Sequence, residues 1–396
     1  MNMNEQMKES EESILHTYNR FPVVFEKGQG CYLYDSEGKE YLDFAAGIAV
    51  NSLGYHYPGY DEALKDQIDK LMHISNLYYN EPIIEAGAKL VKASGMSKAF
   101  FTNSGTEAIE GALKAAKKYA YARDGHAGHE IIAMNHSFHG RSIGALSVTG
   151  TAHYREPFEP LMGGVKFADF NDLESVKAQI TDKTCAIITE VVQGEGGIYP
   201  AKKEFLEGLR QICDEKDIML IFDEIQCGMG RTGHYFAWQA YGVQPDIMTS
   251  AKALGCGVPV GAFVLGEKAA KASLEPGDHG TTYGGNPFVC AAVSKVFDIY
   301  ENDKIIEHVQ ETAPYLEQKL DEIVAKHECA ATRRGMGFMQ GIVIQGRPVG
   351  EVVKAALAKG LLVISAGSDV LRIVPPLVIT KEHIDKMAAI LDECME

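Results

Sequence analysis

Six short apolar segments between residues 95 and 270 constrain the fold of this chain more than any other feature. They are almost continuously apolar rather than alternating, which is typical of strands that are covered on both faces. Helical segments lie between several of them, and residues 105–120 repeat their apolar positions at the helical period. This alternation predicts an α/β fold in which helices flank a mostly parallel sheet. The six apolar segments are 98–103, 130–135, 185–190, 218–224, 246–252 and 260–266.

The two ends of the chain predict a second, smaller α+β unit. Residues 31–44 form two aromatic-rich runs around a turn-rich stretch, which is typical of a hairpin. After residue 290 a long helical region precedes several short apolar segments and a final helix from Thr380. Because chain termini often lie close together, we expect the N-terminal segment to pack with the C-terminal part. The expected division is an N-terminal segment (1–60), a large domain (61–288) and a small domain (289–396).

Composition excludes some classes of partner. A net charge of −16 repels phosphate backbones, so nucleic acid is not expected, although a small anion could bind in a locally positive pocket. The polar N-terminus lacks the features of a secretory signal, and no apolar run approaches the roughly 20 residues that cross a bilayer. The eight cysteines are scattered without a C-x-x-C pair, which indicates reduced thiols. We therefore expect a cytoplasmic protein without membrane contact, and no clustered Cys/His set predicts a metal.

Polar residues follow five of the predicted strands at the point where each strand ends. In open α/β sheets, ligands bind beyond the carboxyl ends of the strands. These residues therefore predict one shared pocket. They are Asn103 to Glu107, His136 to Arg141, Glu190, Asp223 to Gln226, and Lys252.

Gly105 and Thr106 admit two interpretations. At the start of a helix, free backbone N–H groups and the helix dipole favour an anion, and glycine allows it to approach closely. The same stretch, Ser104 to Glu107, also fits a simple capping box. The sequence leaves both open.

Four further residues each have a structural and a functional interpretation. Asp223 follows a buried strand and needs a partner, which is either an ion-pairing side chain or a protonated ring nitrogen. Lys252 either reaches solvent or, in a desolvated pocket, becomes a nucleophilic amine that forms an imine with an aldehyde. Phe138 is either core or a stacking surface for a flat ring. Arg141 is either a solvated charge or a bidentate clamp for a carboxylate.

Rival enzyme classes have weaker support. Gly228 to Gly233 matches G-x-G-x-x-G, but no clear crossover helix follows it. The first acidic residue after it, Asp246, comes too early for the usual ribose contact at about 20 residues, which disfavours a nicotinamide-dependent oxidoreductase. The sequence has no G-x-S-x-G elbow of an α/β-hydrolase. A binding module without catalysis would not explain a lysine and an aspartate at neighbouring strand ends.

Six ordered motifs across nearly the whole chain resemble those of the class III pyridoxal-phosphate aminotransferases. They are NSGTEA (103–108), SFHGR (137–141), VVQGEGG (191–197), FDEIQCGMGRTG (222–233), SAKALGCGVPVGA (250–262) and HGTTYGGNP (279–287). Residues 47–54, 76–82 and 144–150 resemble the acetylornithine aminotransferase branch in particular. The resemblance implies the type I fold of pyridoxal-phosphate enzymes.

The resemblance also implies pyridoxal 5'-phosphate as the cofactor. Lys252 would carry it as an imine, and Asp223 would keep its ring nitrogen protonated so that the ring acts as an electron sink. The other cofactor contacts would be Gln226 at the ring hydroxyl, Phe138 stacked on the ring, Gly105 and Thr106 at the phosphate, and Thr282 from the neighbouring subunit of a homodimer with shared active sites.

For the substrate, the resemblance implies two arginines. Arg141 would bind the α-carboxylate, and Arg372 would bind a second carboxylate, with Glu195 as its switchable partner. Thr281 and Tyr18 are further candidate contacts. The implied reaction moves the terminal amino group of N-acetylornithine to 2-oxoglutarate, in arginine biosynthesis. The alternatives are ornithine, 4-aminobutyrate or N-succinyl-diaminopimelate aminotransferase and glutamate-semialdehyde aminomutase.

Overall fold

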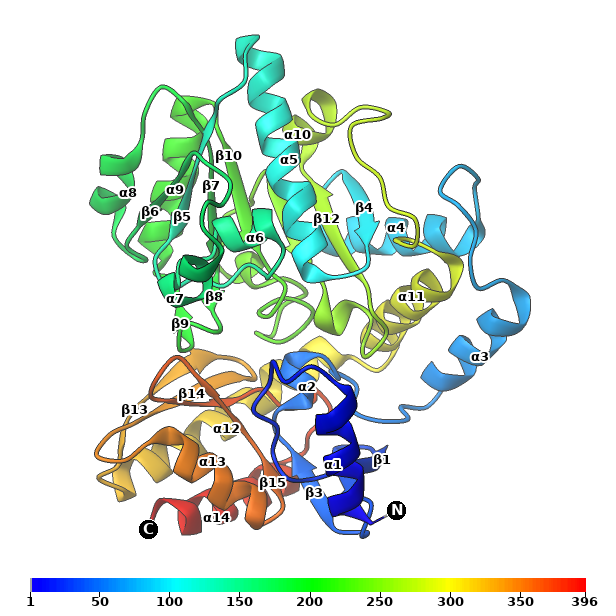
Figure 1. Ribbon diagram of the computed structural model, residues 1–396, viewed down its shortest axis with the longest axis vertical. Coiled ribbons are helices and arrows are strands. Elements are labelled where there is room, and N and C mark those ends of the chain that lie inside the picture. The colour runs from blue at the N-terminus through cyan, green and yellow to red at the C-terminus, as the bar shows by residue number, and fades with distance from the viewer. Residues whose placement is uncertain (1) are drawn as a thin grey trace.

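The computed structural model describes residues 2–396, and its upper part contains a seven-stranded sheet (Figure 1). β12 is antiparallel to both of its neighbours, and the other neighbouring strands are parallel. The predicted α/β fold with a mostly parallel sheet is therefore confirmed. The strands follow one another in the order β4 (Lys98–Thr102), β12 (Gly261–Leu265), β11 (Ile247–Ser250), β10 (Met219–Asp223), β7 (Thr184–Glu190), β5 (Glu130–Met134) and β6 (Val165–Ala168).

Burial of the strands explains their apolar sequences. β7, β10, β11 and β12 are buried at every residue, as strands covered on both faces must be. The covering helices are α4 (Glu81–Ser94), α5 (Gly105–Asp124), α6 (Ile143–Ser147), α8 (Leu173–Gln179), α9 (Lys203–Lys216) and α10 (Glu267–Ala272), whereas α3 (Tyr60–Lys70) lies away from the sheet (Figure 1).

Helix α5 packs tightly against the sheet and begins at its carboxyl edge. Ser104 caps its start by accepting a hydrogen bond from the Glu107 N–H (3.3 Å). Midway along the helix, Gly111 leaves room for the Phe263 ring of β12, because a Cβ there would collide with the ring. The sheet and the cap together fix where the first turn of α5 points.

The lower part combines residues from both ends of the chain. Its strands are β1 (Phe25–Gln29), β2 (Tyr32–Asp35), β3 (Glu40–Asp43) and β15 (Leu361–Leu362) in one sheet, and β13 (Ala330–Met336), β14 (Met339–Ile344), β17 (Val370–Ile373) and β16 (Ile364–Ala366) in another. The predicted hairpin is β2–β3, and β3 pairs in parallel with β15. The N-terminal segment thus packs with C-terminal residues, whereas the domain boundaries at residues 60 and 288 stay predictions.

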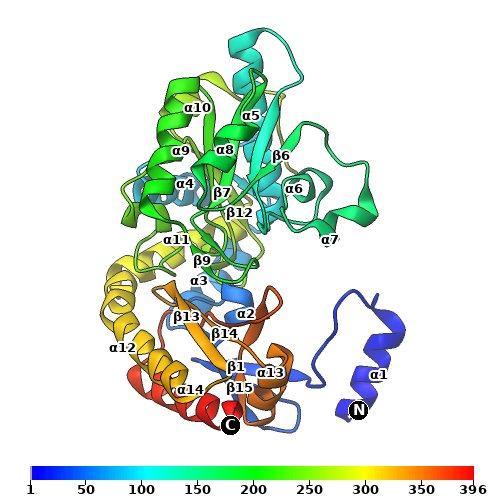
Figure 2. The same cartoon turned by 90° about the vertical axis from the view of Figure 1, so that its left-hand side faces the viewer.

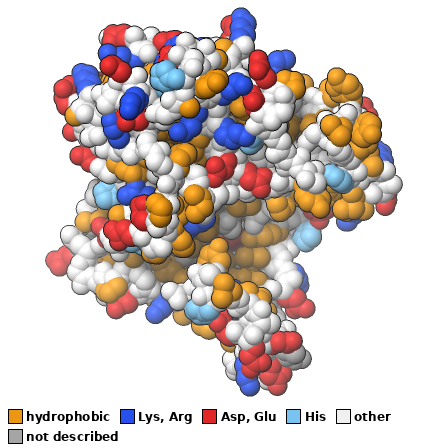
Figure 3. Space-filling view, turned by 45° about the horizontal axis from the view of Figure 1, so that its top comes forward, with side chains coloured by type: hydrophobic (Ala, Val, Ile, Leu, Met, Phe, Trp, Pro, Cys, Tyr) orange, Lys and Arg blue, Asp and Glu red, His pale blue; other side chains and the backbone are white. Residues whose placement is uncertain are grey.

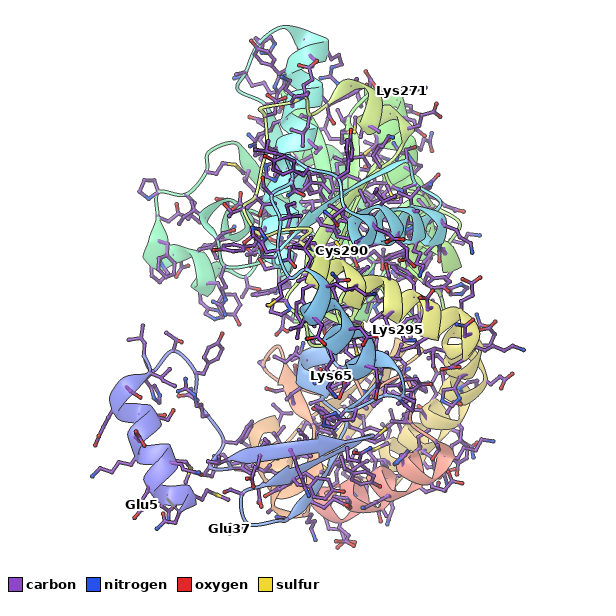
Figure 4. The ribbon with its side chains drawn as sticks, turned by 90° about the vertical axis from the view of Figure 1, so that its right-hand side faces the viewer. Glu5, Glu37, Lys65, Lys271, Cys290 and Lys295 are labelled. Carbon is purple, nitrogen blue, oxygen red and sulfur yellow. The ribbon has the colours of Figure 1, made fainter. Side chains whose placement is uncertain are left out.

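Four helices complete this half of the molecule. α11 (Pro287–Asn302), which carries Cys290 and Lys295, runs from the upper part toward the lower part (Figure 4). The others are α12 (Ile305–Lys326), α13 (Val349–Ala358) and α14 (Lys381–Met395). The short remaining elements are α2 (Ala46–Ala49), α7 (Ala152–Arg155), η1 (Glu156–Phe158), β8 (Val192–Gln193), β9 (Tyr199–Pro200), η2 (Ala237–Ala240) and η3 (Lys252–Leu254).

Helix α1 (Met3–Ser13) stands apart from the rest of the molecule (Figure 2). None of its described residues is buried.

Within residues 2–396, no helix combines the length and the apolar character that a membrane crossing requires.

Candidate active site

Three adjacent parallel strands bring polar side chains together at the carboxyl edge of the large sheet. Asp223 at the end of β10 pairs in register with Glu190 of β7 on one side and with Thr249 of β11 on the other. Lys252 follows β11 by two residues and has a left-handed backbone (φ +48°). A non-glycine residue in this conformation is strained, and such strain clusters at functional sites.

These residues line a cavity of about 440 Å³. That volume lies in the range of small-molecule and cofactor sites. Seven of the sequence-predicted site residues meet there, although they come from four separate segments of the chain. They are Gly105, Thr106, Phe138, Arg141, Asp223, Gln226 and Lys252.

Asp223 is held by three hydrogen bonds at the floor of this cavity. It is 4% exposed. Its Oδ1 accepts from the Ile225 N–H (3.0 Å) and the Thr249 hydroxyl (3.2 Å), and its Oδ2 lies 2.7 Å from His139 Nδ1. Burial opposes the charged imidazole, but the hydrogen bond and charge of Asp223 prevail and raise the pKa of His139. His139 and Asp223 therefore form a buried pair in which the imidazole Nδ1 faces the carboxylate.

Glu190 and His139 belong to the site, although their sequence pattern indicated no individual role for either. Glu190 accepts hydrogen bonds from the Gly194 N–H (3.1 Å) and the Phe138 N–H (3.3 Å). Burial raises its pKa to about 7, and the nearby Asp223 charge adds to the rise. The available signals were the position of Glu190 at a strand end and of His139 inside SFHGR.

The surroundings of Lys252 make its side-chain amine easier to deprotonate. Burial lowers its pKa, an effect that the Glu195 carboxylate partly opposes. A lowered pKa increases the fraction of neutral amine, which is the nucleophilic form.

The first turn of α5 supplies the anion-binding part of the cavity. Ser104 caps the helix, but the Glu107 carboxylate accepts a hydrogen bond from the Asn103 N–H (2.9 Å) and not from the N–H of Ser104. The N-cap therefore forms without the reciprocal bond of a capping box. Gly105 and Thr106 also line the cavity, so the cap and an anion site are compatible. A Cβ on Gly105 would come within 2.9 Å of Ile225 Cδ1. Only glycine fits between the cavity and this side chain without a shift.

Glu195 and Arg372 form the ion pair that the sequence analysis expected. Arg372 lies on β17 of the lower part and is 3% exposed. Its Nη1 lies 2.5 Å from Glu195 Oε1, and its Nη2 lies 3.4 Å from Oε2. Nη1 also donates to Gln226 Oε1 (3.1 Å), which ties the pair to the cavity. Burial alone would raise the pKa of Glu195, but the Arg372 charge holds it below its ordinary value.

Five predicted residues are not among those that line the cavity. Glu195 and Arg372 adjoin it through Gln226. Thr281 lies outside it, and its hydroxyl accepts a hydrogen bond from Asn103 Nδ2 (3.2 Å). Thr282 is exposed, and Tyr18 is 73% exposed on the N-terminal segment. Their proposed roles stay predictions.

Two alternative sites are weaker on geometry. The G-x-G-x-x-G stretch of residues 228–233 opens no helix; its Arg231 instead donates to the Pro375 and Phe338 carbonyl oxygens in the lower part. It therefore joins the two parts and does not form a dinucleotide-binding turn. Among the described residues, Asp124, His126 and His129 could approach a metal, with ligand atoms within 4.8 Å of one another. Arg123 already pairs with Asp124 there (Nε–Oδ1 2.6 Å).

Comparison with known proteins identifies the family. The class-III aminotransferase model matches residues 14–395. An acetylornithine aminotransferase of Methanocaldococcus jannaschii is 49% identical over 96% of this chain and 95% of its own length. A succinylornithine transaminase of Yersinia pseudotuberculosis is 44% identical over 94% and 92%. The solved ornithine aminotransferase of Toxoplasma gondii has a TM-score of 0.95 at 28% identity, covering 100% of this chain and 95% of that one. With this sheet and this cavity, the chain belongs to the class-III aminotransferase family.

Proposed function

We propose that this aminotransferase moves the terminal amino group of N-acetylornithine to 2-oxoglutarate, with pyridoxal 5'-phosphate held on Lys252. One observation carries the proposal. A lysine with a lowered pKa, a buried carboxylate and a helix N-terminus all line the same cavity. Relatives named acetylornithine aminotransferase, such as the Methanocaldococcus protein, support the choice of donor and a role in arginine biosynthesis.

The residues of the cavity fit this cofactor. The N-terminal turn of α5 offers backbone N–H groups for a phosphate, and Gly105 keeps that approach open. Asp223 lines the same cavity, is 4% exposed, and would pair with a protonated ring nitrogen. When bound, pyridoxal phosphate supplies an aldehyde that attaches amines reversibly and a ring that withdraws electrons from the reacting carbon.

The residues of the chain hold the reactants and move the proton. Asp223, itself oriented by Thr249, Ile225 and His139, would keep a ring nitrogen of the cofactor protonated. The Lys252 Nζ would accept the proton from the reacting substrate carbon and return it as a general acid. Phe138, which lines the same cavity, would offer an apolar surface to the ring.

Two substrates of different shape use the same site in a ping-pong cycle. The second carboxylate of glutamate or 2-oxoglutarate would bind Arg372 after Glu195 moves away. With N-acetylornithine, whose acetamido group is neutral, Glu195 would stay on Arg372 as it does here. Arg141, which also lines the cavity, would bind the carboxylate that lies far from the reacting carbon, which is the α-carboxylate of N-acetylornithine and the γ-carboxylate of glutamate.

A homodimer with shared active sites is part of the proposal. Leu77 and Tyr79, between α3 and α4, are 87% and 97% exposed, and Tyr283 is 62% exposed. Figure 3 shows hydrophobic side chains gathered on the right-hand side, the side on which Figure 1 places α3. Exposed apolar patches of this kind mark protein interfaces. A second copy covering them would allow Thr282 to reach the partner's cavity. The eight free cysteines support a reducing, cytoplasmic location.

A donor panel tests the proposal. Purified enzyme with pyridoxal phosphate and 2-oxoglutarate should use N-acetylornithine with a higher kcat/KM than ornithine or 4-aminobutyrate. N-succinylornithine belongs in the panel because relatives at 44% identity carry that name. A preference for another donor would replace the proposed substrate. Turnover without any external amino acceptor would indicate an aminomutase.

A further inference from the structure

Arg141 differs from Arg372 in having no anionic partner within the protein. Among the described residues, no carboxylate oxygen lies within 4.0 Å of its guanidinium nitrogens, and no protein acceptor takes a hydrogen bond from them. The side chain is exposed and lines the cavity. Its N–H donors are therefore available to a ligand.

Two aromatic rings hold the Arg141 guanidinium in place. Its Cζ lies 4.1 Å from the ring centroid of Tyr154 and 5.4 Å from that of Phe138. The two rings are nearly perpendicular, at 79° with centroids 5.9 Å apart. The guanidinium therefore contacts two rings at once. A ring face attracts a cation without accepting its N–H groups in the plane of the fork.

Tyr154 is itself supported from the sheet. It lies on the four-residue helix α7, and the next residue, Arg155, lies 4.0 Å above the Phe167 ring of β6. Phe138, in turn, is held by the hydrogen bond from its N–H to Glu190. The two rings that contact Arg141 therefore lie on segments that are each fixed by a further contact.

We propose that Tyr154 is the positioning residue that orients Arg141 toward the α-carboxylate of the substrate. The inference rests on the proposed function, in which Arg141 binds that carboxylate. An aromatic partner orients the guanidinium and leaves its donors free, whereas a carboxylate partner would compete with the substrate. The two arginines of the site would then differ in when they are available to the substrate. Arg141 is always available, and Arg372 becomes available only when Glu195 leaves.

The test compares two donors that differ only in the α-carboxylate. N-acetylputrescine is N-acetylornithine with a hydrogen in place of that group, and both are assayed with the holoenzyme and 2-oxoglutarate. Tyr154→Leu keeps an apolar side chain but removes the ring. We expect the KM for N-acetylornithine to rise roughly 2- to 30-fold, the range for one lost cation–π contact. The KM for N-acetylputrescine and both kcat values should change less than twofold. Tyr154→Phe, which keeps the ring, should restore the wild-type KM.

Matched controls separate this role from a structural one. Tyr315→Leu removes a ring beneath Lys319, 5.6 Å from its centroid, on a helix of the lower part. It should leave both KM values unchanged. An equal loss with both donors, or no loss with Tyr154→Leu, would overturn the inference. If the wild-type enzyme rejects N-acetylornithine but uses glutamate, the proposed substrate fails. Tyr154 is then tested on glutamate and 2-aminobutyrate, a pair that differs only in the carboxylate far from the reacting carbon.

Discussion

Replacing Glu195 by glutamine should shift the donor preference of the enzyme toward glutamate. In the structure Glu195 occupies the Arg372 guanidinium, with Nη1–Oε1 at 2.5 Å and Nη2–Oε2 at 3.4 Å. The second carboxylate of glutamate needs the same guanidinium and must displace Glu195. N-acetylornithine has no second carboxylate and therefore gains nothing when Glu195 leaves Arg372.

The size of the shift follows from the contact that glutamate must break. A hydrogen bond between charged groups contributes about 1.5–3 kcal/mol. Arg372 holds the pKa of Glu195 below its ordinary value, so this competitor is ionised at neutral pH. A glutamine amide carries no charge and binds the guanidinium less strongly. The ratio of kcat/KM for glutamate to that for N-acetylornithine should therefore rise by roughly 10- to 100-fold.

The assay is the first half-reaction of the holoenzyme, followed by the change in cofactor absorbance with each donor alone. The double variant Glu195→Gln/Arg372→Gln is the control and should show no gain for glutamate, because the arginine that benefits is absent. An unchanged ratio in Glu195→Gln, or an equal gain in the double variant, would refute the switch.

Three other substitutions test the cavity. Asp223→Ala should lower kcat by roughly 10²- to 10³-fold at saturating cofactor, since it removes the anchor of the ring nitrogen and one partner of a buried pair; near-normal turnover would contradict its role. Glu190→Gln should flatten a pH dependence of stability. Burial raises the Glu190 pKa from 4.5 to about 7, so folding of the wild-type apoprotein becomes less favourable as pH rises between these values, by about 3 kcal/mol. Urea denaturation of both apoproteins at pH 5 and pH 8 measures the difference, and identical pH profiles would exclude the effect. Gly105→Ala should weaken cofactor affinity about fivefold, because its Cβ would crowd Ile225 at an overpacking penalty of about 1 kcal/mol. Gly163→Ala, with nothing within 4 Å of the new Cβ, is the matched control, and equal affinities would remove the argument.

The apolar segments of the sequence located six of the seven strands of the large sheet but not the edge strand β6 (Val165–Ala168). The five inner strands are buried at all or all but one of their residues, which explains their continuous apolar runs. The other edge strand, β4, is only partly buried, but its sequence still contains an apolar run. β6 is buried only at Ala168, and Lys166 interrupts its short apolar sequence. β13 (Ala330–Met336) was not predicted either, because exposed residues in its Ala-Thr-Arg-Arg sequence interrupt the apolar pattern.

The candidate site was predictable residue by residue but not as a network. Strand ends alone marked Asp223 and Lys252. The contact of His139 with Asp223 spans 84 residues and depends on the register of neighbouring strands, which no local pattern specifies. The Glu195–Arg372 pair, 177 residues apart, was expected only through the family resemblance. The role of Thr282 depends on a partner chain, and the roles of Thr282 and Tyr18 stay predictions.

Borohydride reduction of the holoenzyme, followed by mass spectrometry of its peptides, shows directly whether Lys252 holds the cofactor. We expect one pyridoxyl-modified lysine per chain, at Lys252, and we expect Lys252→Ala to lose both the modification and turnover. Modification at a different lysine, or activity retained in Lys252→Ala, would contradict this role of Lys252.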